Sequence, residues 1–187
     1  MNVAGEPSAG GVPCYLDLPL RTFLGLLRDD QPAPAGGTAA ALGVALAASL
    51  CVMTARLSSR HLPEAAELAA EAERLADLVA PLAQADADAY RAVIATRRHP
   101  AALSDAADVP MRVAEIGVQV AALATRLATH GNPNLHGDAV TAALLAEAGV
   151  RSACALVRIN LSGAESDQRL ARVAHLLTAL PSAAVEP

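Results

Sequence analysis

Apolar residues recur along most of this chain at steps of three and four, the spacing of an amphipathic helix. After Asp17, which we expect to be a helix cap, Leu20, Phe23, Leu24 and Leu27 form one such stripe. The same spacing predicts further helices over residues 37–58, 63–98, 108–130, 138–161 and 166–180.

A proline lies inside the longest of these segments. Pro81 has no backbone N–H to donate, so it should kink or break the helix over residues 63–98. No linker divides the chain, and the elements together predict an all-α, single-domain helical bundle of about five to six helices. We expect a disordered lead over residues 1–16, the helical domain over residues 17–181 and a tail over residues 182–187.

Composition agrees with a helical fold and excludes some classes of function. Apolar residues make up 53% of the 187 positions and aromatic residues only 2%, with alanine and leucine prominent. The net charge of −5 and the lack of a basic run argue against a nucleic-acid partner. The N-terminus lacks a signal-peptide pattern, and Cys14, Cys51 and Cys154 have no CxxC spacing, which favours reduced packing residues in a cytoplasmic protein.

One uncharged stretch is long enough to cross a membrane. It is QPAPAGGTAAALGVALAASLCVM, residues 31–53, and a bilayer needs about 20 apolar residues. Alanine dominates it, and alanine gains little from transfer into lipid. Burial inside a bundle or between subunits is the favoured interpretation.

The start of that stretch is a candidate binding site. Gly36, Gly37 and Thr38 would expose backbone N–H groups at the positive end of a helix, where an anion or a polar ligand edge can dock. The alternative is structural, with glycine permitting the turn and Thr38 capping the helix.

Asp86 is the main candidate for catalysis. It shares one helical face with Leu82, Tyr90 and Val93, a face that is otherwise apolar apart from the Tyr90 hydroxyl. Burial raises the pKa of an unpaired carboxyl group, which suits it to take and return a proton near neutral pH. The alternative is a buried aspartate satisfied by hydrogen bonds or by an arginine.

Polar residues also crowd the linker before residue 138. Asn132, Asn134, His136 and Asp138 could bind a polar heterocycle, or they could simply form a turn and a helix cap. His130, His136 and Asp138 do not follow a known metal-ligand spacing, so no metal is expected.

The order of these motifs resembles the cyclodeaminase/cyclohydrolase family of folate enzymes. It is carried by PAPAGGTAAALG, LAQADADAYRAVIATRRHP, GNPNLHGDAVTAALL and VRINL, and covers roughly residues 17 to 180. The resemblance implies an all-helical homodimer that binds folate in clefts near the dimer interface.

The resemblance also implies roles for single residues. Asp86 matches the family's acidic residue and would be the catalytic general base and acid. The residues implied in substrate binding are Pro34, Gly36, Gly37, Thr38, Arg98, Asn132, Asn134 and Asp138. Four positions depart from the usual pattern, namely Ala35, His99, Gly137 and Leu156.

The resulting hypothesis is hydrolysis of 5,10-methenyltetrahydrofolate to 10-formyltetrahydrofolate, with the folate as substrate and with no metal or retained cofactor. The alternatives are formimidoyltetrahydrofolate cyclodeaminase, a non-catalytic folate or small-molecule binder, and a structural bundle without a ligand. Neither nucleic acid nor membrane is expected as a partner. The hypothesis requires Asp86 and the Gly36–Gly37 backbone to share one pocket.

Overall fold

The computed structural model describes residues 14–181. The predicted tail and residues 1–13 of the predicted lead lie outside the described residues. Within the described range the chain is helical, which confirms the predicted all-α class. The α-helices are α1 Leu20–Leu26, α2 Gly36–Arg56, α3 Ala65–Val79, α4 Leu82–Ala95, α5 Pro100–Ala106, α6 Asp108–His130, α7 His136–Asn160 and α8 Gln168–Ala179, with 3₁₀ turns η1 Tyr15–Asp17 and η2 Pro133–Leu135.

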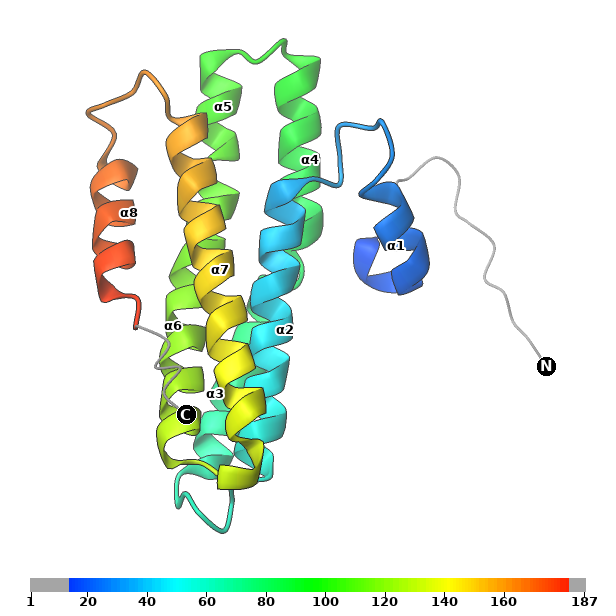
Figure 1. Ribbon diagram of the computed structural model, residues 1–187. Coiled ribbons are helices and arrows are strands. Elements are labelled where there is room, and N and C mark those ends of the chain that lie inside the picture. Colours follow the sequence, from blue (N-terminus) through cyan, green and yellow to red (C-terminus); the bar gives the residue numbers. More distant parts are fainter. Residues whose placement is uncertain (1–13, 182–187) are drawn as a thin grey trace, which may run out of the picture.

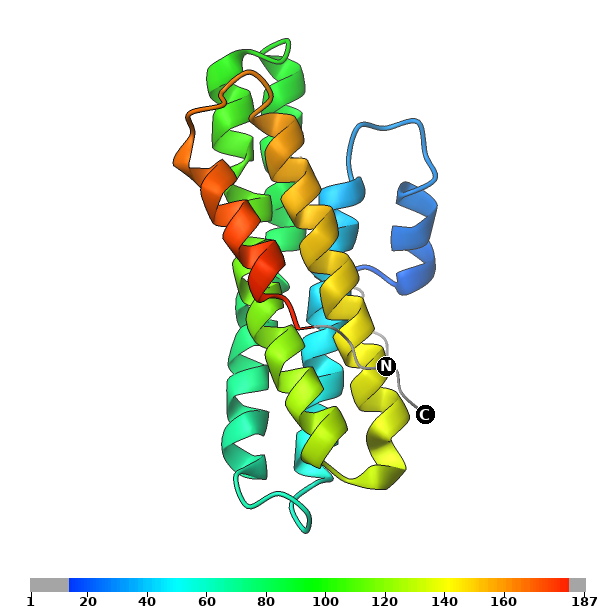
Figure 2. The same ribbon diagram turned by 60° about the vertical axis from the view of Figure 1, so that its left-hand side comes forward.

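The bundle is elongated, with its long helices roughly parallel or antiparallel to one another (Figures 1 and 2). Helices α2, α6 and α7 form its centre, α3 packs on α2 and α6, and α4 packs on α2. Helix α8 lies against α6 and α7. The predicted helix over residues 63–98 is broken at Pro81 into α3 and α4, as expected of a proline inside a helix.

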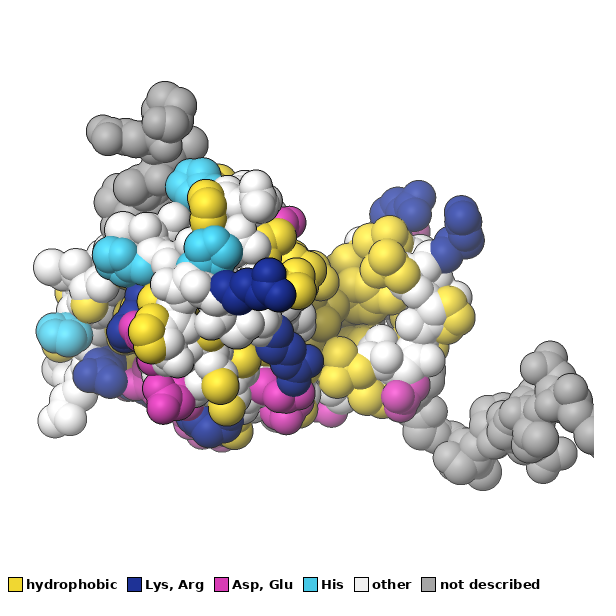
Figure 3. All heavy atoms as spheres, turned by 90° about the horizontal axis from the view of Figure 1, so that it is seen from below, with side chains coloured by type: hydrophobic (Ala, Val, Ile, Leu, Met, Phe, Trp, Pro, Cys, Tyr) yellow, Lys and Arg dark blue, Asp and Glu magenta, His cyan; other side chains and the backbone are white. Residues whose placement is uncertain are grey.

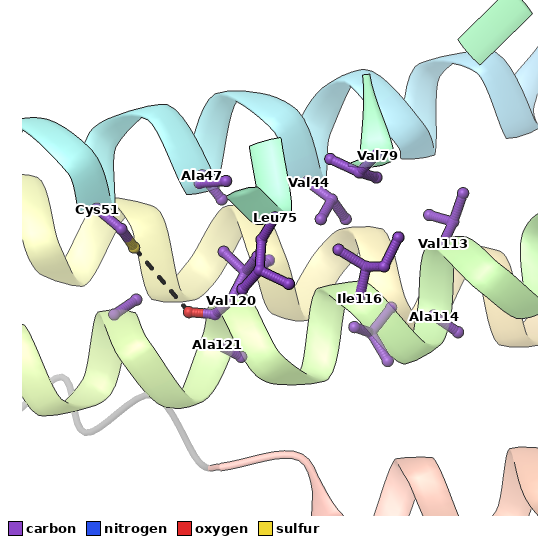
Figure 4. Packing of buried hydrophobic residues seen from close by; sticks show 14 of the residues in the cluster. Val44, Ala47, Cys51, Leu75, Val79, Val113, Ala114, Ile116, Val120 and Ala121 are labelled. Carbon is purple, nitrogen blue, oxygen red and sulfur yellow. Dashed lines mark hydrogen bonds between the residues drawn. The ribbon is translucent and has the colours of Figure 1, made fainter. Parts of the chain in front are cut away.

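The core is built from small side chains. Val44, Ala47, Cys51, Leu75 and Val120 are fully buried between α2, α3 and α6 (Figure 4). Burial raises the pKa of the Cys51 thiol to about 12. Cys51 and Cys154 are therefore packing residues, as predicted, whereas Cys14 is exposed.

Two glycines let the central helices approach closely. A Cβ atom placed on Gly149 of α7 would lie 2.5 Å from the Val44 Cγ2 atom and 3.2 Å from the Ala40 carbonyl oxygen of α2. A Cβ atom on Gly117 of α6 would lie 2.6 Å from the Val150 Cγ2 atom and 3.3 Å from that of Val44. The three central helices are thus in contact around Val44 with no space for one further methyl group.

The apolar content of α2 is explained by this packing. By length and composition two segments of the described chain could cross a membrane, Gly36–Arg56 and Pro133–Asn160, and 56% and 44% of their most apolar windows are buried inside the bundle. Helix α2 lies at the centre of the bundle, so its composition requires no membrane.

Helix α1 stands beside the bundle and belongs to a second, smaller cluster. Tyr15 and Phe23 are buried there with ring centroids 5.7 Å apart, and the Arg91 guanidinium of α4 donates to the Tyr15 hydroxyl at 2.6 Å. Residues 15 and 16, which were predicted to lie in the lead, are therefore part of the folded domain. Asp17 ends η1 and does not cap α1, whose N-cap is Pro19.

Candidate active site

A pocket lies where the first turn of α2 meets α4, the α4–α5 turn and the last turn of α7. Its volume is about 260 Å³. Its lining residues are Ala35, Gly36, Gly37, Asp86, Tyr90, Arg98, Ala106, Leu156, Ile159 and Asn160. In Figure 1 these elements come together in the upper half of the bundle.

The Asp86 carboxylate lies directly against the backbone of Gly37. A Cβ atom on Gly37 would lie only 2.0 Å from Asp86 Oδ1 and 2.6 Å from Oδ2, so only glycine permits this approach. The Thr38 hydroxyl, which is fully buried, donates to Asp86 Oδ2 at 3.3 Å. The glycine pair at the start of α2 therefore makes room for a carboxylate of the same chain.

Burial and hydrogen bonding act on Asp86 in opposite directions. Loss of hydration raises the pKa of its carboxyl group, and hydrogen bonds from the side chain and backbone of Thr38 partly offset this increase. No cation within residues 14–181 lies at ion-pair distance from Asp86. The positive end of α2 is its main electrostatic partner. A carboxylate in this setting has an increased proton affinity and can act as a base.

Arg98 enters the pocket from an unusual turn. The Arg98 N–H donates to the Val93 carbonyl at 2.8 Å and the Arg97 N–H to the Ile94 carbonyl at 3.0 Å, which is the Schellman pattern that ends a helix. Arg97 and Arg98 have φ angles of 52° and 60°, in the left-handed region that normally favours glycine. Arg98 has no ion-pair partner among the described residues, so its charge is available to a ligand.

The wall opposite α4 is mostly apolar. Leu156 and Ile159 of α7 face the pocket together with Ala106 of α5. The Asn160 amide donates to the Ala106 carbonyl at 3.3 Å, so this asparagine joins the end of α7 to α5. The polar groups directed at a ligand therefore come chiefly from α2, α4 and the turn after α4.

The structure brings together one part of the residue set implied by the resemblance. Asp86, Gly36, Gly37 and Arg98 line the same pocket, so the predicted placement of an aspartate beside the bare start of α2 is confirmed. Two other residues of the set support the pocket without lining it. Thr38 is buried behind Asp86, and Pro34 is buried in the segment that leads into α2.

The asparagine-rich turn is not part of this pocket within one chain. Asn132 donates its backbone N–H to the Ser58 hydroxyl at 2.9 Å and its amide to the Leu57 carbonyl at 3.2 Å, which joins the turn to the end of α2. Asn134 and Asp138 lie at the start of α7, whereas the pocket lies at its end, and 25 helical residues span about 37 Å. Within one chain, the asparagine-rich turn and the Asp86 pocket are therefore separate, and the part that the resemblance implies for this turn in substrate binding stays a prediction.

Several lining residues were absent from the predicted site. Periodicity placed Tyr90 on the Asp86 face, but no binding role was assigned to it, and the signal for Asn160 is a polar residue in an apolar helix end. Ala106 and Ile159 carry no such signal, because only the packing of α5 against α7 brings them to the pocket. Residues 14–181 contain no group of three or more histidine, cysteine and acidic side chains arranged to hold a metal ion.

Comparison with known proteins finds a related sequence and a similar architecture in two folate enzymes. The chain is 30% identical to methenyltetrahydrofolate cyclohydrolase of Methylorubrum extorquens, over 84% of this chain and 88% of that protein. It superimposes on the crystal structure of formiminotetrahydrofolate cyclodeaminase from Thermotoga maritima with a TM-score of 0.79 and 26% identity, covering 88% of each chain. The family described as formiminotransferase-cyclodeaminase matches residues 19–177, which include the whole pocket. This protein therefore belongs to the formiminotransferase-cyclodeaminase family.

Proposed function

We propose that this protein hydrolyses 5,10-methenyltetrahydrofolate to 10-formyltetrahydrofolate. The name of the Methylorubrum relative supports this reaction. The observation that carries the proposal is the position of Asp86, the one carboxylate among the described residues that line the pocket. Its pKa is raised by burial, and it lies against the start of α2.

The reaction needs little beyond position and proton transfer, because the methenyl carbon is part of a cation and is already electrophilic. Asp86 accepts a proton from water as the water oxygen bonds to the carbon that bridges N5 and N10. The carbon–N5 bond then breaks, N5 takes a proton back from Asp86, and the remaining hydroxyl proton leaves as the formyl C=O forms. One proton is released in total.

The size of the pocket indicates which part of the substrate it holds. A volume of about 260 Å³ is below the roughly 300–1,000 Å³ typical of sites that enclose a whole ligand. We therefore place the reacting rings inside and the glutamate tail outside. Arg98, which is exposed at the rim, would pair with the carboxylates of that tail.

We further propose a cytoplasmic homodimer. Five large apolar side chains have at least 43% of their surface exposed, namely Leu20 and Leu24 of α1, Leu46 of α2, Leu57 directly after α2 and Leu144 of α7. Figure 3 shows hydrophobic side chains in the hollow between α1 and the rest of the chain. A second copy would cover these surfaces. Asn132, Asn134 and Asp138 lie far from the pocket of their own chain, so in a dimer they would act at the pocket of the partner copy.

Cyclodeamination is the second candidate, and the name of the Thermotoga neighbour favours it. In that reaction N10 attacks the formimino carbon and ammonia leaves after protonation. Asp86 would again carry the proton, so the pocket geometry supports both reactions. Assaying each substrate separately distinguishes them.

The test compares two aspartates of the same helix. Loss of methenyltetrahydrofolate absorbance is followed for the wild type, Asp86→Asn and Asp88→Asn. We expect Asp86→Asn to lower kcat by about 10²-fold or more. Asp88 is exposed and pairs with Arg91 at 2.7 Å, so Asp88→Asn should remain close to the wild type. A wild-type protein that accelerates neither reaction but binds reduced folates would support a binding protein instead.

The composite site is tested by mixing inactive chains. If Asn134 acts in the pocket of a second copy, Asp86→Asn and Asn134→Ala chains should each be inactive alone and should regain activity when mixed. A monomer in sedimentation experiments, or an active Asn134→Ala variant, contradicts this part of the proposal.

A further inference from the structure

Tyr90 is the second hydroxyl or carboxyl group that α4 directs into the pocket. It follows Asp86 by four residues, so the two side chains leave the helix on the same face with Cβ atoms about 6 Å apart. Both line the pocket and both are half-buried. A small reacting group between α4 and α7 can therefore contact both side chains at once.

The two tyrosines of this chain differ in what their hydroxyl groups do. The Tyr15 side chain is buried, and its hydroxyl accepts a hydrogen bond from Arg91 at 2.6 Å. The Tyr90 hydroxyl has no hydrogen-bond partner within residues 14–181. Every buried side-chain nitrogen or oxygen in this range does have a partner, so the unpaired Tyr90 hydroxyl is not buried. The Tyr90 hydroxyl is thus open to the pocket and available to a ligand.

The rest of the pocket offers few alternative donors. Leu156 and Ile159 present only carbon atoms, and one N–H of the Asn160 amide is bonded to the Ala106 carbonyl, which holds that amide against α5. Arg98 lies at the exposed rim, beyond the end of α4. The side-chain donor that α4 itself places beside Asp86 is therefore Tyr90, in addition to the backbone N–H groups at the start of α2.

We propose that Tyr90 is a catalytic residue that donates a hydrogen bond to the oxygen that water adds to the bridging carbon. This inference rests on the proposed hydrolysis. As the tetrahedral adduct loses its hydroxyl proton and the carbon–N5 bond breaks, negative charge develops on that oxygen before the C=O bond is complete. A donor fixed on α4 stabilises this charge, and Tyr90 keeps its own proton throughout.

Removing only the hydroxyl tests the inference. Loss of one such donor costs on the order of 10²-fold in rate, so Tyr90→Phe should lower kcat by about that factor with little change in KM. The midpoint of urea unfolding should not change, because this hydroxyl bonds to no described part of the protein. The acidic limb of the pH–rate profile, which Asp86 sets, should also stay in place.

Tyr15→Phe is the matched control. It removes a hydroxyl that accepts a bond from Arg91, so it should lower the unfolding midpoint while leaving kcat near the wild-type value.

Three outcomes would overturn the role of Tyr90. If the wild type hydrolyses the substrate and Tyr90→Phe retains kcat within twofold, Tyr90 is not catalytic although the proposed function stands. A higher KM at unchanged kcat would make Tyr90 a ground-state binding residue only. If the wild type hydrolyses nothing, the proposed function fails and this inference fails with it.

Discussion

Replacing Gly37 by alanine should separate activity from stability. The added Cβ atom would lie 2.0 Å from Asp86 Oδ1, and ordinary contact begins at 3.4 Å, so the carboxylate must withdraw by about 1.4 Å. It would then leave the start of α2 and lose the hydrogen bond from Thr38, which is 3.3 Å long in the native arrangement.

The two effects have different magnitudes. A misplacement of about 1 Å at a reacting group can cost 10²-fold in rate, so we expect kcat/KM of Gly37→Ala to fall by at least about that factor. Alanine in a helix is roughly 0.5–1 kcal/mol more favourable than glycine, and the lost hydrogen bond costs about 1 kcal/mol. The free energy of unfolding should therefore stay close to that of the wild type.

The assay combines methenyltetrahydrofolate hydrolysis with urea unfolding and uses Gly43→Ala as the control. Gly43 lies in the same helix, and a Cβ atom there would meet nothing within 4 Å. We expect wild-type activity and a gain of roughly 0.5–1 kcal/mol in unfolding free energy for this control. If Gly37→Ala were as active as Gly43→Ala, close contact between Asp86 and the α2 backbone would not be needed for the reaction.

Three further changes test the surroundings of Asp86 and the turn after α4. Thr38→Val removes a hydrogen bond that lowers the pKa of Asp86, so the acidic limb of kcat/KM should move to higher pH, and an unmoved limb would show that Thr38 does not tune the carboxylate. Asp86→Asn should stabilise the protein at pH 7. Burial raises the pKa of Asp86 in the folded state, so the stability that its protonated form contributes is lost as the pH rises through that pKa, whereas asparagine stays neutral. Urea unfolding at pH 7 should show this gain and unfolding near pH 3 should not; equal effects at both values would refute the assignment to charge. Arg97→Gly should raise the unfolding free energy by roughly 1 kcal/mol, because glycine adopts the φ of 52° without strain. Its kcat should stay unchanged, since Arg97 does not line the pocket. A loss of stability would mean that the Arg97 side chain stabilises the turn.

The long helices could be predicted from sequence because each depends on local spacing and on proline positions. Pro81 separates α3 from α4 through the loss of one hydrogen-bond donor, a cause that acts within a few residues. Helix α5 was not predicted, because its seven residues are too few to show a clear period. The packing of Tyr15 under α4 also depends on a contact over 76 positions, which spacing cannot reveal.

The pocket was predictable only where one helix carries its residues. The alignment of Asp86 with an apolar face of α4 is a local property, and it indicated the candidate base. The meeting of Asp86 with Gly37 depends on how α4 packs on α2, and it was expected only from the resemblance. The left-handed backbone at Arg97 and Arg98 could not be expected, because arginine does not favour that conformation and only the tertiary structure imposes it.

The close contact of α2, α6 and α7 around Val44 has a consequence for how this enzyme can diverge. Gly36 lies eight residues before Val44, about 12 Å along α2, so one continuous helix supplies both the pocket wall and the packed contact. That contact leaves no room for a larger residue at Gly149 or Gly117. Changes of specificity are therefore expected from side chains at the opposite rim, around the α4–α5 turn, and not from the glycine contacts between α2, α6 and α7.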